Sequence, residues 1–136
     1  MVIVTDKGFG PDTWDAGFAP AAANDTLGKA LDIASDFDPR RAGQAILHAP
    51  MLRIDFPNFA DGRGFTIAAQ LRRMGYNGRL RARGHIIADQ YAMARRAGFD
   101  EIEISDDLAA RQDQSQWLAR ADWRAHHYQN RLMAAS

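Results

Sequence analysis

The feature of this sequence that most restricts its fold is an alternation of short β-prone and amphipathic helical stretches. Strands are predicted at 51–55, 79–83 and 100–104, and helices at 65–74 and between Gly84 and Ala97. Strands joined through single helices by short connections pair in parallel, with right-handed crossovers. The sequence therefore predicts an α/β fold with a mainly parallel sheet built from βαβ units. The strand order stays open between a flavodoxin-like sheet and a partial barrel.

The segments on either side extend this core into one domain spanning residues 1–136. We expect a strand at 2–5, a loop at 8–11, irregular chain at 16–28, a strand at 29–34 and a helix from Asp38-Pro39 to about His48. Aspartate at the cap and proline at the first helical position favour that helix start. No internal repeat or linker interrupts the chain.

A last helix is predicted at about 107–133. Its apolar stripe keeps a three-four spacing through Leu118, Ala121, Ala125, Tyr128 and Leu132. We favour docking of this stripe on the sheet of the same domain, and a partner-binding helix is the alternative.

Composition excludes several classes of function. The chain has no cysteine, which rules out thiol catalysis, a protein-held iron–sulfur cluster and a thiolate zinc site within it. No apolar run approaches the roughly 20 residues that cross a bilayer, and the first residues lack a secretory-signal layout. We therefore expect a cytoplasmic protein without a membrane partner.

Motifs for common nucleotide, hydrolase and metal sites are also missing. There is no Walker loop, Gly-x-Gly-x-x-Gly, Gly-x-Ser-x-Gly or His-Glu-x-x-His. The adjacent His126 and His127 would point in different directions on a helix, unlike metal ligands at i and i+4. We predict no metal site, and any flavin would have to be borrowed rather than bound through a known motif.

The formal net charge of zero hides a cationic middle. Residues 62–98 carry eight arginines and one acid, whereas the segments before and after them have net charges of −4 and −3. Guanidinium groups suit bidentate binding of carboxylates, phosphates and sulfur oxyanions, although a GC-rich genome would also enrich arginine. This pattern indicates an anion site, an acidic partner surface or internal charge neutralisation. Overall neutrality and the spread of the arginines argue against nucleic acid as a partner.

Three of these arginines alternate along the strand predicted at 79–83. Arg79, Arg81 and Arg83 should project from one face of the sheet. A strand buried on both faces does not carry such a row. We favour an edge strand or a protein interface, and ligand contact is the alternative.

Ligands of parallel α/β folds gather where the strands end and the helices begin. Three loops should meet there, at 56–64, 84–89 and 105–107. The glycines of the first loop allow close ligand approach beside a helix start, and Arg63 between them adds a bidentate donor. The candidate ligand-binding residues are Asn58, Asp61, Gly62, Arg63, Gly64, Arg81, Arg83 and Gln90. Helix capping by Asp61 and simple chain turning by the glycines form the structural alternative.

Three residues near these loops are weaker candidates for proton transfer: Asp61, His85 and Asp89. An acid in the first turn of a helix also favours the helix dipole, and a single loop histidine is usually exposed to solvent. The sequence alone does not separate these roles.

Several stretches together resemble one bacterial family, the domain-of-unknown-function family numbered 934. They are IDFPNFADGRGF at 54–65, Leu71-Arg72, RLRARG at 79–84, Asp89-Gln90, Gly98-Phe99-Asp100 and, near the end, Tyr128-Gln129. The resemblance covers about residues 51–104. Members are commonly labelled as oxidoreductases of sulfite reduction, because their genes tend to lie beside those of assimilatory sulfite reductase.

The resemblance implies a role in sulfur assimilation and cysteine biosynthesis. We expect an accessory protein of sulfite reduction that binds an anionic ligand or the sulfite reductase itself. The alternative is a flavin- or small-acid-dependent oxidoreductase. A third possibility is that the arginine face and the last helix serve to form a homodimer.

Overall fold

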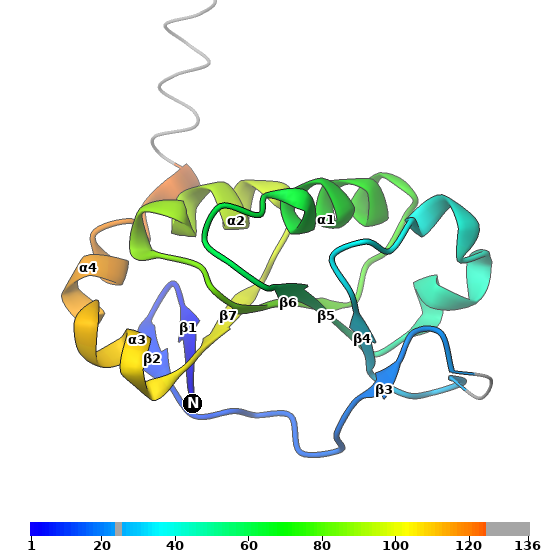
Figure 1. Ribbon diagram of the computed structural model, residues 1–136, viewed down its shortest axis with the longest axis horizontal. Coiled ribbons are helices and arrows are strands. Elements are labelled where there is room, and N and C mark those ends of the chain that lie inside the picture. Colours follow the sequence, from blue (N-terminus) through cyan, green and yellow to red (C-terminus); the bar gives the residue numbers. More distant parts are fainter. Residues whose placement is uncertain (24–25, 125–136) are drawn as a thin grey trace, which may run out of the picture.

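The predicted alternation of strands and helices forms the centre of a mixed, mostly parallel sheet of seven strands (Figure 1). The structure, a computed structural model, describes residues 1–23 and 26–124. The central strands are β5 (Met51–Phe56), β6 (Arg79–Gly84) and β7 (Glu101–Ile104). They are joined by α1 (Arg63–Arg73) and by η3 (Ala88–Gln90) with α2 (Tyr91–Ala97). The α/β prediction is confirmed.

The other strands complete the sheet on both sides, in the order β2-β1-β7-β6-β5-β4-β3. They are β1 (Val2–Thr5), β2 (Gly8–Gly10), β3 (Ala19–Pro20) and β4 (Leu31–Ile33). Strands β3 to β7 run in parallel, and β1 pairs antiparallel with both β7 and β2. The loop expected at 8–11 is wrong, because residues 8–10 return beside β1 as an edge strand.

The parallel strands β3 to β7 lie next to one another in sequence order. This order decides between a flavodoxin-like sheet and a partial barrel. A flavodoxin-like sheet reverses its strand order, and this sheet does not. Right-handed crossovers that always advance in one direction place their helices on one face. Accordingly, α1 and α2 cover the same face of the sheet (Figure 1). This is the arrangement of the partial-barrel alternative.

Beneath the helices the sheet is apolar. Alternate residues of the strands, such as Leu52, Leu80 and Ile102, are fully buried there. Helix α1 adds Ile67, Ala68 and Leu71 to the same core, and α2 adds Tyr91 and Ala94. Gly98 ends α2 in the left-handed region, at φ 116°, as its position in the sequence predicts.

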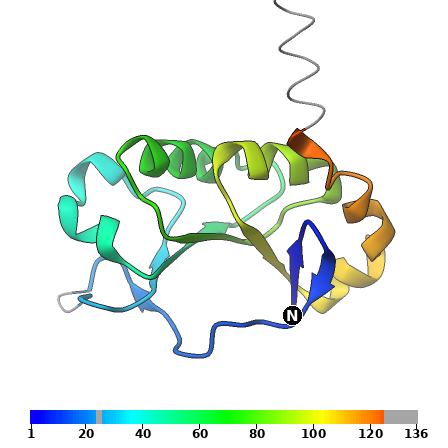
Figure 2. The same cartoon turned by 180° about the vertical axis from the view of Figure 1, so that it is seen from behind.

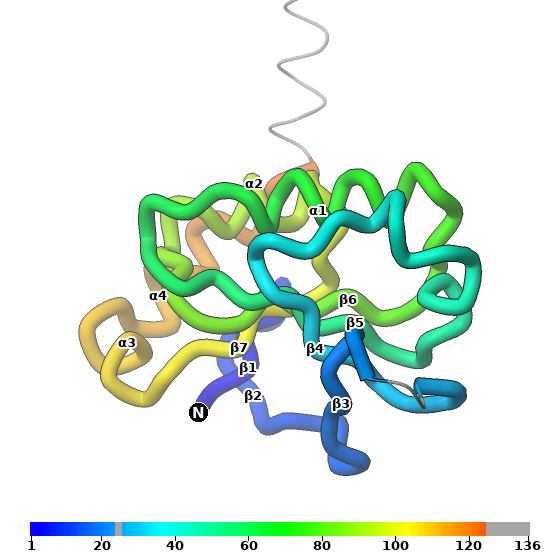
Figure 3. The backbone as a smooth tube through the Cα atoms, turned by 45° about the vertical axis from the view of Figure 1, so that its right-hand side comes forward, coloured from blue at the N-terminus to red at the C-terminus, as the bar shows by residue number. Residues whose placement is uncertain are grey.

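The opposite face of the sheet carries charged side chains, and none of the described helices covers it (Figure 1). Residues 11–18, which we call the crossing segment, run from β2 to β3 beneath this face (Figures 2 and 3). Phe18 of this segment packs on Arg53 of β5, whose guanidinium carbon lies 3.7 Å from the ring centroid. Arg53 also forms an ion pair with Asp32 of β4 at 2.6 Å.

Arg81 is at the centre of this charged face and has no exposed surface. Its guanidinium forms ion pairs with Glu101 and Glu103 of the neighbouring β7, at 2.8 and 2.9 Å. The third partner is Asp12 of the crossing segment, at 2.7 Å. Hydrogen bonding to Arg81 lowers the pKa of Asp12 below its ordinary value. This ion pair therefore stabilises the fold above the ordinary pKa and loses that effect as the pH falls through the lowered pKa.

These contacts correct the edge-strand interpretation of the alternating arginines. β6 lies between β5 and β7, in the middle of the sheet. The arginines do share a face, but neighbouring strands supply the acids that neutralise them: Arg79 pairs with Glu101 and Arg83 with Glu103. Of the three interpretations of the cationic middle, internal charge neutralisation therefore accounts for the arginines of β6.

Two predicted helices are shorter than expected. The segment at 39–48 forms two 3-10 helices, η1 (Pro39–Arg41) and η2 (Gln44–His48). Asp38 caps the first of them, as predicted, by accepting a hydrogen bond from the Arg40 backbone. Gly43 separates the two helices at φ 72°. That conformation favours glycine and does not occur inside a right-handed helix.

The continuous helix expected from 107 is replaced by α3 (Asp106–Arg111) and α4 (Gln114–Leu118). Tertiary hydrogen bonds at Gln112 accompany the break. Its side chain accepts a hydrogen bond from the Ala88 backbone, and its carbonyl accepts one from the buried Trp117 indole. Leu118 is exposed. The predicted stripe residues Ala125, Tyr128 and Leu132 lie outside the described residues, as do His126-His127.

Among the residues that the structure describes, no helix has both the length and the apolar character needed to span a membrane.

Replacing Arg81 tests how much the fold depends on the charged face. Arg81→Gln removes the cation that Glu101 and Glu103 share, although each acid keeps a second arginine, so we expect a loss of about 2–3 kcal/mol in the free energy of unfolding. Arg83→Gln, on the same strand but half exposed, should cost at most about 1 kcal/mol. Urea unfolding followed by circular dichroism measures both. Equal effects of the two variants would contradict the central role of Arg81.

Candidate functional site

The three loops that the sequence brings to the carboxyl ends of the strands do meet there. They enclose a cavity of about 340 Å³, which we call the carboxyl-edge cavity. It is lined by Phe59, Gly84, His85, Ser105, Asp107, Leu108 and Arg111. Each of the predicted loops contributes at least one of these residues.

Close backbone contact holds the first two loops together. Gly84 adopts φ 116°, and a Cβ atom there would lie 2.6 Å from the Phe56 carbonyl oxygen. The same carbonyl accepts a hydrogen bond from the His85 backbone at 3.0 Å. Only glycine fits at position 84, because both the backbone conformation and the available space exclude a side chain.

His85 lines the cavity with one ring nitrogen already engaged. Its Nδ1 lies 3.2 Å from the Phe56 carbonyl, and its ring meets the Phe59 ring edge to face at 5.1 Å between centroids. Because a carbonyl only accepts hydrogen bonds, Nδ1 carries a proton in this contact. Nε2 has no hydrogen-bond partner within the described parts of the chain, so it is available to a ligand.

The far side of the cavity comes from the start of α3. The Ser105 hydroxyl caps this helix by accepting a hydrogen bond from the Leu108 backbone at 3.1 Å. Arg111, the last residue of α3, is exposed and has no carboxylate within 4.0 Å among the described residues. Sequence analysis missed Arg111, because a continuous helix from 107 gave no reason to turn it towards the other two loops.

Arg63 lies in a different cavity from His85. Its guanidinium binds the Asp61 carboxylate at 2.6 Å and donates to the Ser35 hydroxyl at 2.9 Å. It lines a cavity between α1 and residues 35–40. The structure thus does not bring Arg63 and the Gly84 turn into one anion site.

Asp61 organises the start of α1. It accepts hydrogen bonds from both the side chain and the backbone of Arg63, and this lowers its pKa to about 2. Asn58 shapes the same loop by accepting a hydrogen bond from the Ala60 backbone at 3.0 Å. A carboxyl with so low a pKa is ionised at neutral pH and is a weak base. These contacts correspond to the structural alternative for Asp61.

The remaining candidates near the loops make local contacts. Gln90 accepts a hydrogen bond from the Ile87 backbone at 3.0 Å and donates to the Phe59 carbonyl at 3.4 Å, so it ties the loops together. Asp89 forms an exposed ion pair with Arg120 at 2.6 Å. His85 and Asp89 do not form the mutually orienting pair considered from the sequence.

Two further candidates lie on the charged face of the sheet. Arg81 is buried among its three carboxylates, and Arg83 is half exposed and pairs with Glu103 at 3.3 Å. Neither lines the carboxyl-edge cavity. Of the eight candidate ligand-binding residues, Arg63 is the only one that lines a described cavity at this edge of the sheet.

One comparison with known proteins gives a match. A family model described as "Bacterial protein of unknown function (DUF934)" matches residues 30–136. The chain belongs to this family. The DUF934 match is longer than the resemblance seen at about 51–104, and it takes in β4 and both short helices after β7. No curated protein and no solved structure matches the chain.

No cluster of three or more histidine, cysteine or acidic side chains suitable for a metal ion occurs in the described part of this DUF934 protein. The side chains that line the carboxyl-edge cavity supply a guanidinium, an imidazole, a hydroxyl and a carboxylate.

The two glycines that flank Arg63 differ in what they permit. A Cβ at Gly64 would overlap the Phe56 ring, whereas one at Gly62 would have only the Phe65 ring near it, at 3.9 Å. We expect Gly64→Ala to lower the free energy of unfolding by about 1–3 kcal/mol. Gly62→Ala should change it by less than about 0.5 kcal/mol. Urea unfolding measures the difference, and equal stabilities would show that Gly64 is not needed for packing.

The ion pair between Asp61 and Arg63 can be tested by titration. Carbon-detected NMR should give Asp61 a pKa of about 2, and Arg63→Gln should return this pKa towards the ordinary aspartate value of 3.8. The pair stabilises the folded state above the ordinary pKa and loses this effect as the pH falls through the lowered value. An Asp61 pKa unchanged by Arg63→Gln would contradict the assignment.

Proposed function

We propose that this DUF934 protein is an accessory protein of assimilatory sulfite reduction that binds a small anion, such as sulfite, or the sulfite reductase. The sulfur setting is what the family resemblance implies through gene neighbourhood. The description of the family itself assigns no function. The binding role is argued below from the carboxyl-edge cavity.

The observation that carries the proposal is that the Arg111 guanidinium and the His85 imidazole line the same cavity. Neither the guanidinium nor Nε2 of the imidazole has a hydrogen-bond partner among the described residues. A guanidinium donates to the oxygens of a small anion. Because Nδ1 of His85 already carries a proton, Nε2 donates to the same anion in the imidazolium form of the ring. A cavity of about 340 Å³ lies at the lower end of the range for ligand sites, which suits a small ligand.

Binding is better supported than catalysis. Of the three proton-transfer candidates, only His85 lines the carboxyl-edge cavity. Asp61 is held by Arg63 in another cavity, and Asp89 pairs with Arg120. A proton relay needs its groups within hydrogen-bond reach of one reacting atom. The alternative of a flavin- or small-acid-dependent oxidoreductase would have to draw its second acid or base from Asp107 or from a partner.

The proposal predicts measurable binding that depends on Arg111. Isothermal titration calorimetry with sulfite, and co-purification with intact sulfite reductase, test its two forms. Arg111→Gln should weaken sulfite binding by about tenfold, the size expected for loss of a charge-assisted hydrogen bond. Arg120→Gln is the matched control, because Arg120 is exposed but lines no described cavity at this edge.

The proposal fails if sulfite does not bind, no complex with the reductase forms at micromolar concentrations and the reductase activity is unchanged by the protein. Equal losses in Arg111→Gln and Arg120→Gln would also remove the cavity as the site. A coloured protein after purification, with a flavin identified by mass spectrometry, would instead favour the oxidoreductase alternative.

A further inference from the structure

The two helices that cover the sheet end in the same pattern of residues. Helix α1 ends in Leu-Arg-Arg-Met-Gly at 71–75, and α2 ends in Ala-Arg-Arg-Ala-Gly at 94–98. Both helices connect the carboxyl end of one parallel strand to the amino end of the next. The two arginine pairs therefore lie at the amino edge of the sheet, opposite to the carboxyl-edge cavity.

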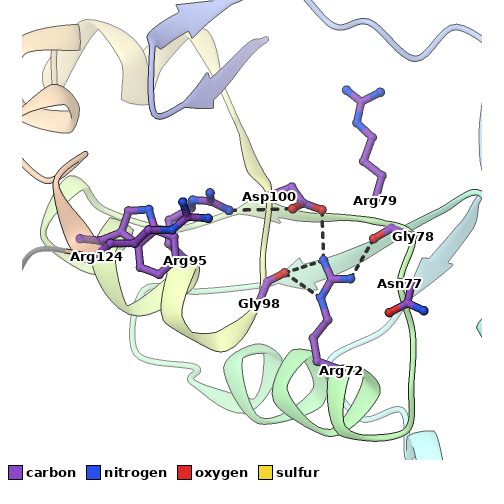
Figure 4. A pocket seen from close by; sticks show the side chains of 9 residues that line it. Arg72, Asn77, Gly78, Arg79, Arg95, Gly98, Asp100 and Arg124 are labelled. Atoms are coloured by element: carbon purple, nitrogen blue, oxygen red, sulfur yellow. Dashed lines mark hydrogen bonds and ion pairs between the residues drawn. The ribbon is translucent and has the colours of Figure 1, made fainter. Parts of the chain in front are cut away.

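The first arginine of each pair is used by the fold. Arg72 donates to the carbonyl oxygens of Gly98 and Gly78 and pairs with Asp100 at 3.1 Å (Figure 4). It also donates to the Tyr76 carbonyl oxygen. All five of its N–H groups have acceptors in these contacts.

Arg95 has the corresponding place on α2. It donates to the Phe99 carbonyl and forms an ion pair with Asp6 at 3.1 Å. The carbonyl groups that follow each helix are thus bound by the first arginine of a pair.

The second arginine of each pair has no such role. Arg73 and Arg96 are exposed, and neither makes a hydrogen bond or lies within 4.0 Å of a carboxylate in the described parts of the chain. The other six arginines between 62 and 98 all pair with acids. The positive charge that the fold leaves unneutralised in this region is therefore concentrated at the ends of two neighbouring helices.

A cavity of about 450 Å³ lies at the same edge and carries the same charge. Its lining includes Arg72, Arg95 and Arg124, with Asp100 as the acid among them (Figure 4). Arg124 is exposed and lies 5.0 Å from the centroid of the Trp123 ring. It has no hydrogen bond within the described residues, so its guanidinium donors are available.

We propose that Arg73, Arg96 and Arg124 form a docking surface for an acidic segment of a partner protein. The three guanidinium groups come from separate elements, so they match carboxylates spaced along a chain better than one compact oxyanion. A duplex nucleic acid interface usually neutralises more phosphates than three arginines can, commonly about 6–10.

This surface is separate from the carboxyl-edge cavity and does not depend on what that cavity binds. A fluorescent peptide of about ten glutamates serves as the probe, with binding followed by anisotropy at about 20 mM and about 200 mM salt, where screening differs strongly. Wild-type protein should bind the peptide at low salt. Arg73→Glu/Arg96→Glu should weaken binding by at least about tenfold, because two attractive charges become repulsive. The neutral variant Arg73→Gln/Arg96→Gln should show an intermediate loss.

The matched control is Arg40→Glu/Arg41→Glu, an exposed arginine pair on η1 with the same charge change. It should lose clearly less affinity than Arg73→Glu/Arg96→Glu, because Arg40 lies beside the middle of α1, near Gln70, and not at the end of the helix. Unchanged melting temperatures will show that the variants fold. The proposal is overturned if wild-type protein does not bind the peptide at low salt, or if the control loses as much affinity. It is also overturned if polyphosphate or duplex DNA binds more tightly than the peptide.

Discussion

The structure depends on the burial of one guanidinium group. Arg81 lies among the parallel strands in the middle of the sheet, on the face that none of the described helices covers, and it has no exposed surface. A buried cation is tolerated only when its hydrogen bonds and charge are satisfied. Glu101 and Glu103 of the next strand and Asp12 of the crossing segment provide that environment. Through this one side chain, the contacts hold β6 to β7 and the crossing segment to the centre of the sheet.

The same requirement explains much of the uneven charge along the chain. The arginines of the middle segment and the acids of both flanking segments meet on folding, chiefly across neighbouring strands and through the crossing segment. Most of the positive charge of residues 62–98 is therefore neutralised by acids within the fold. Only charges that the fold does not use, such as those of Arg73, Arg96 and Arg111, are informative about ligands and partners.

Strand order separates two edges with different chemistry. Because the parallel strands advance without reversal, no crevice forms at a switch in the middle of the sheet. The loops at the carboxyl edge enclose a small mixed cavity with His85 and Arg111. The helix ends at the amino edge present guanidinium groups that have no acidic partner within the described parts of the chain. A binding role at each edge is consistent with a protein that acts by association, and the proton-transfer candidates lie apart from one another.

The sequence by itself determined the strand–helix alternation, the three loops that meet at one edge and the shared face of Arg79, Arg81 and Arg83, because these follow from local periodicity and turn residues. Only the tertiary structure showed that Arg81 is neutralised inside the fold, since its partner Asp12 lies 69 residues away in the sequence. It also divided the last predicted helix, where the buried Trp117 indole requires the Gln112 carbonyl, and it placed Arg63 with Ser35 rather than with His85. Local patterns describe which faces are apolar or charged, but they contain no information about which distant segment supplies the neutralising partner.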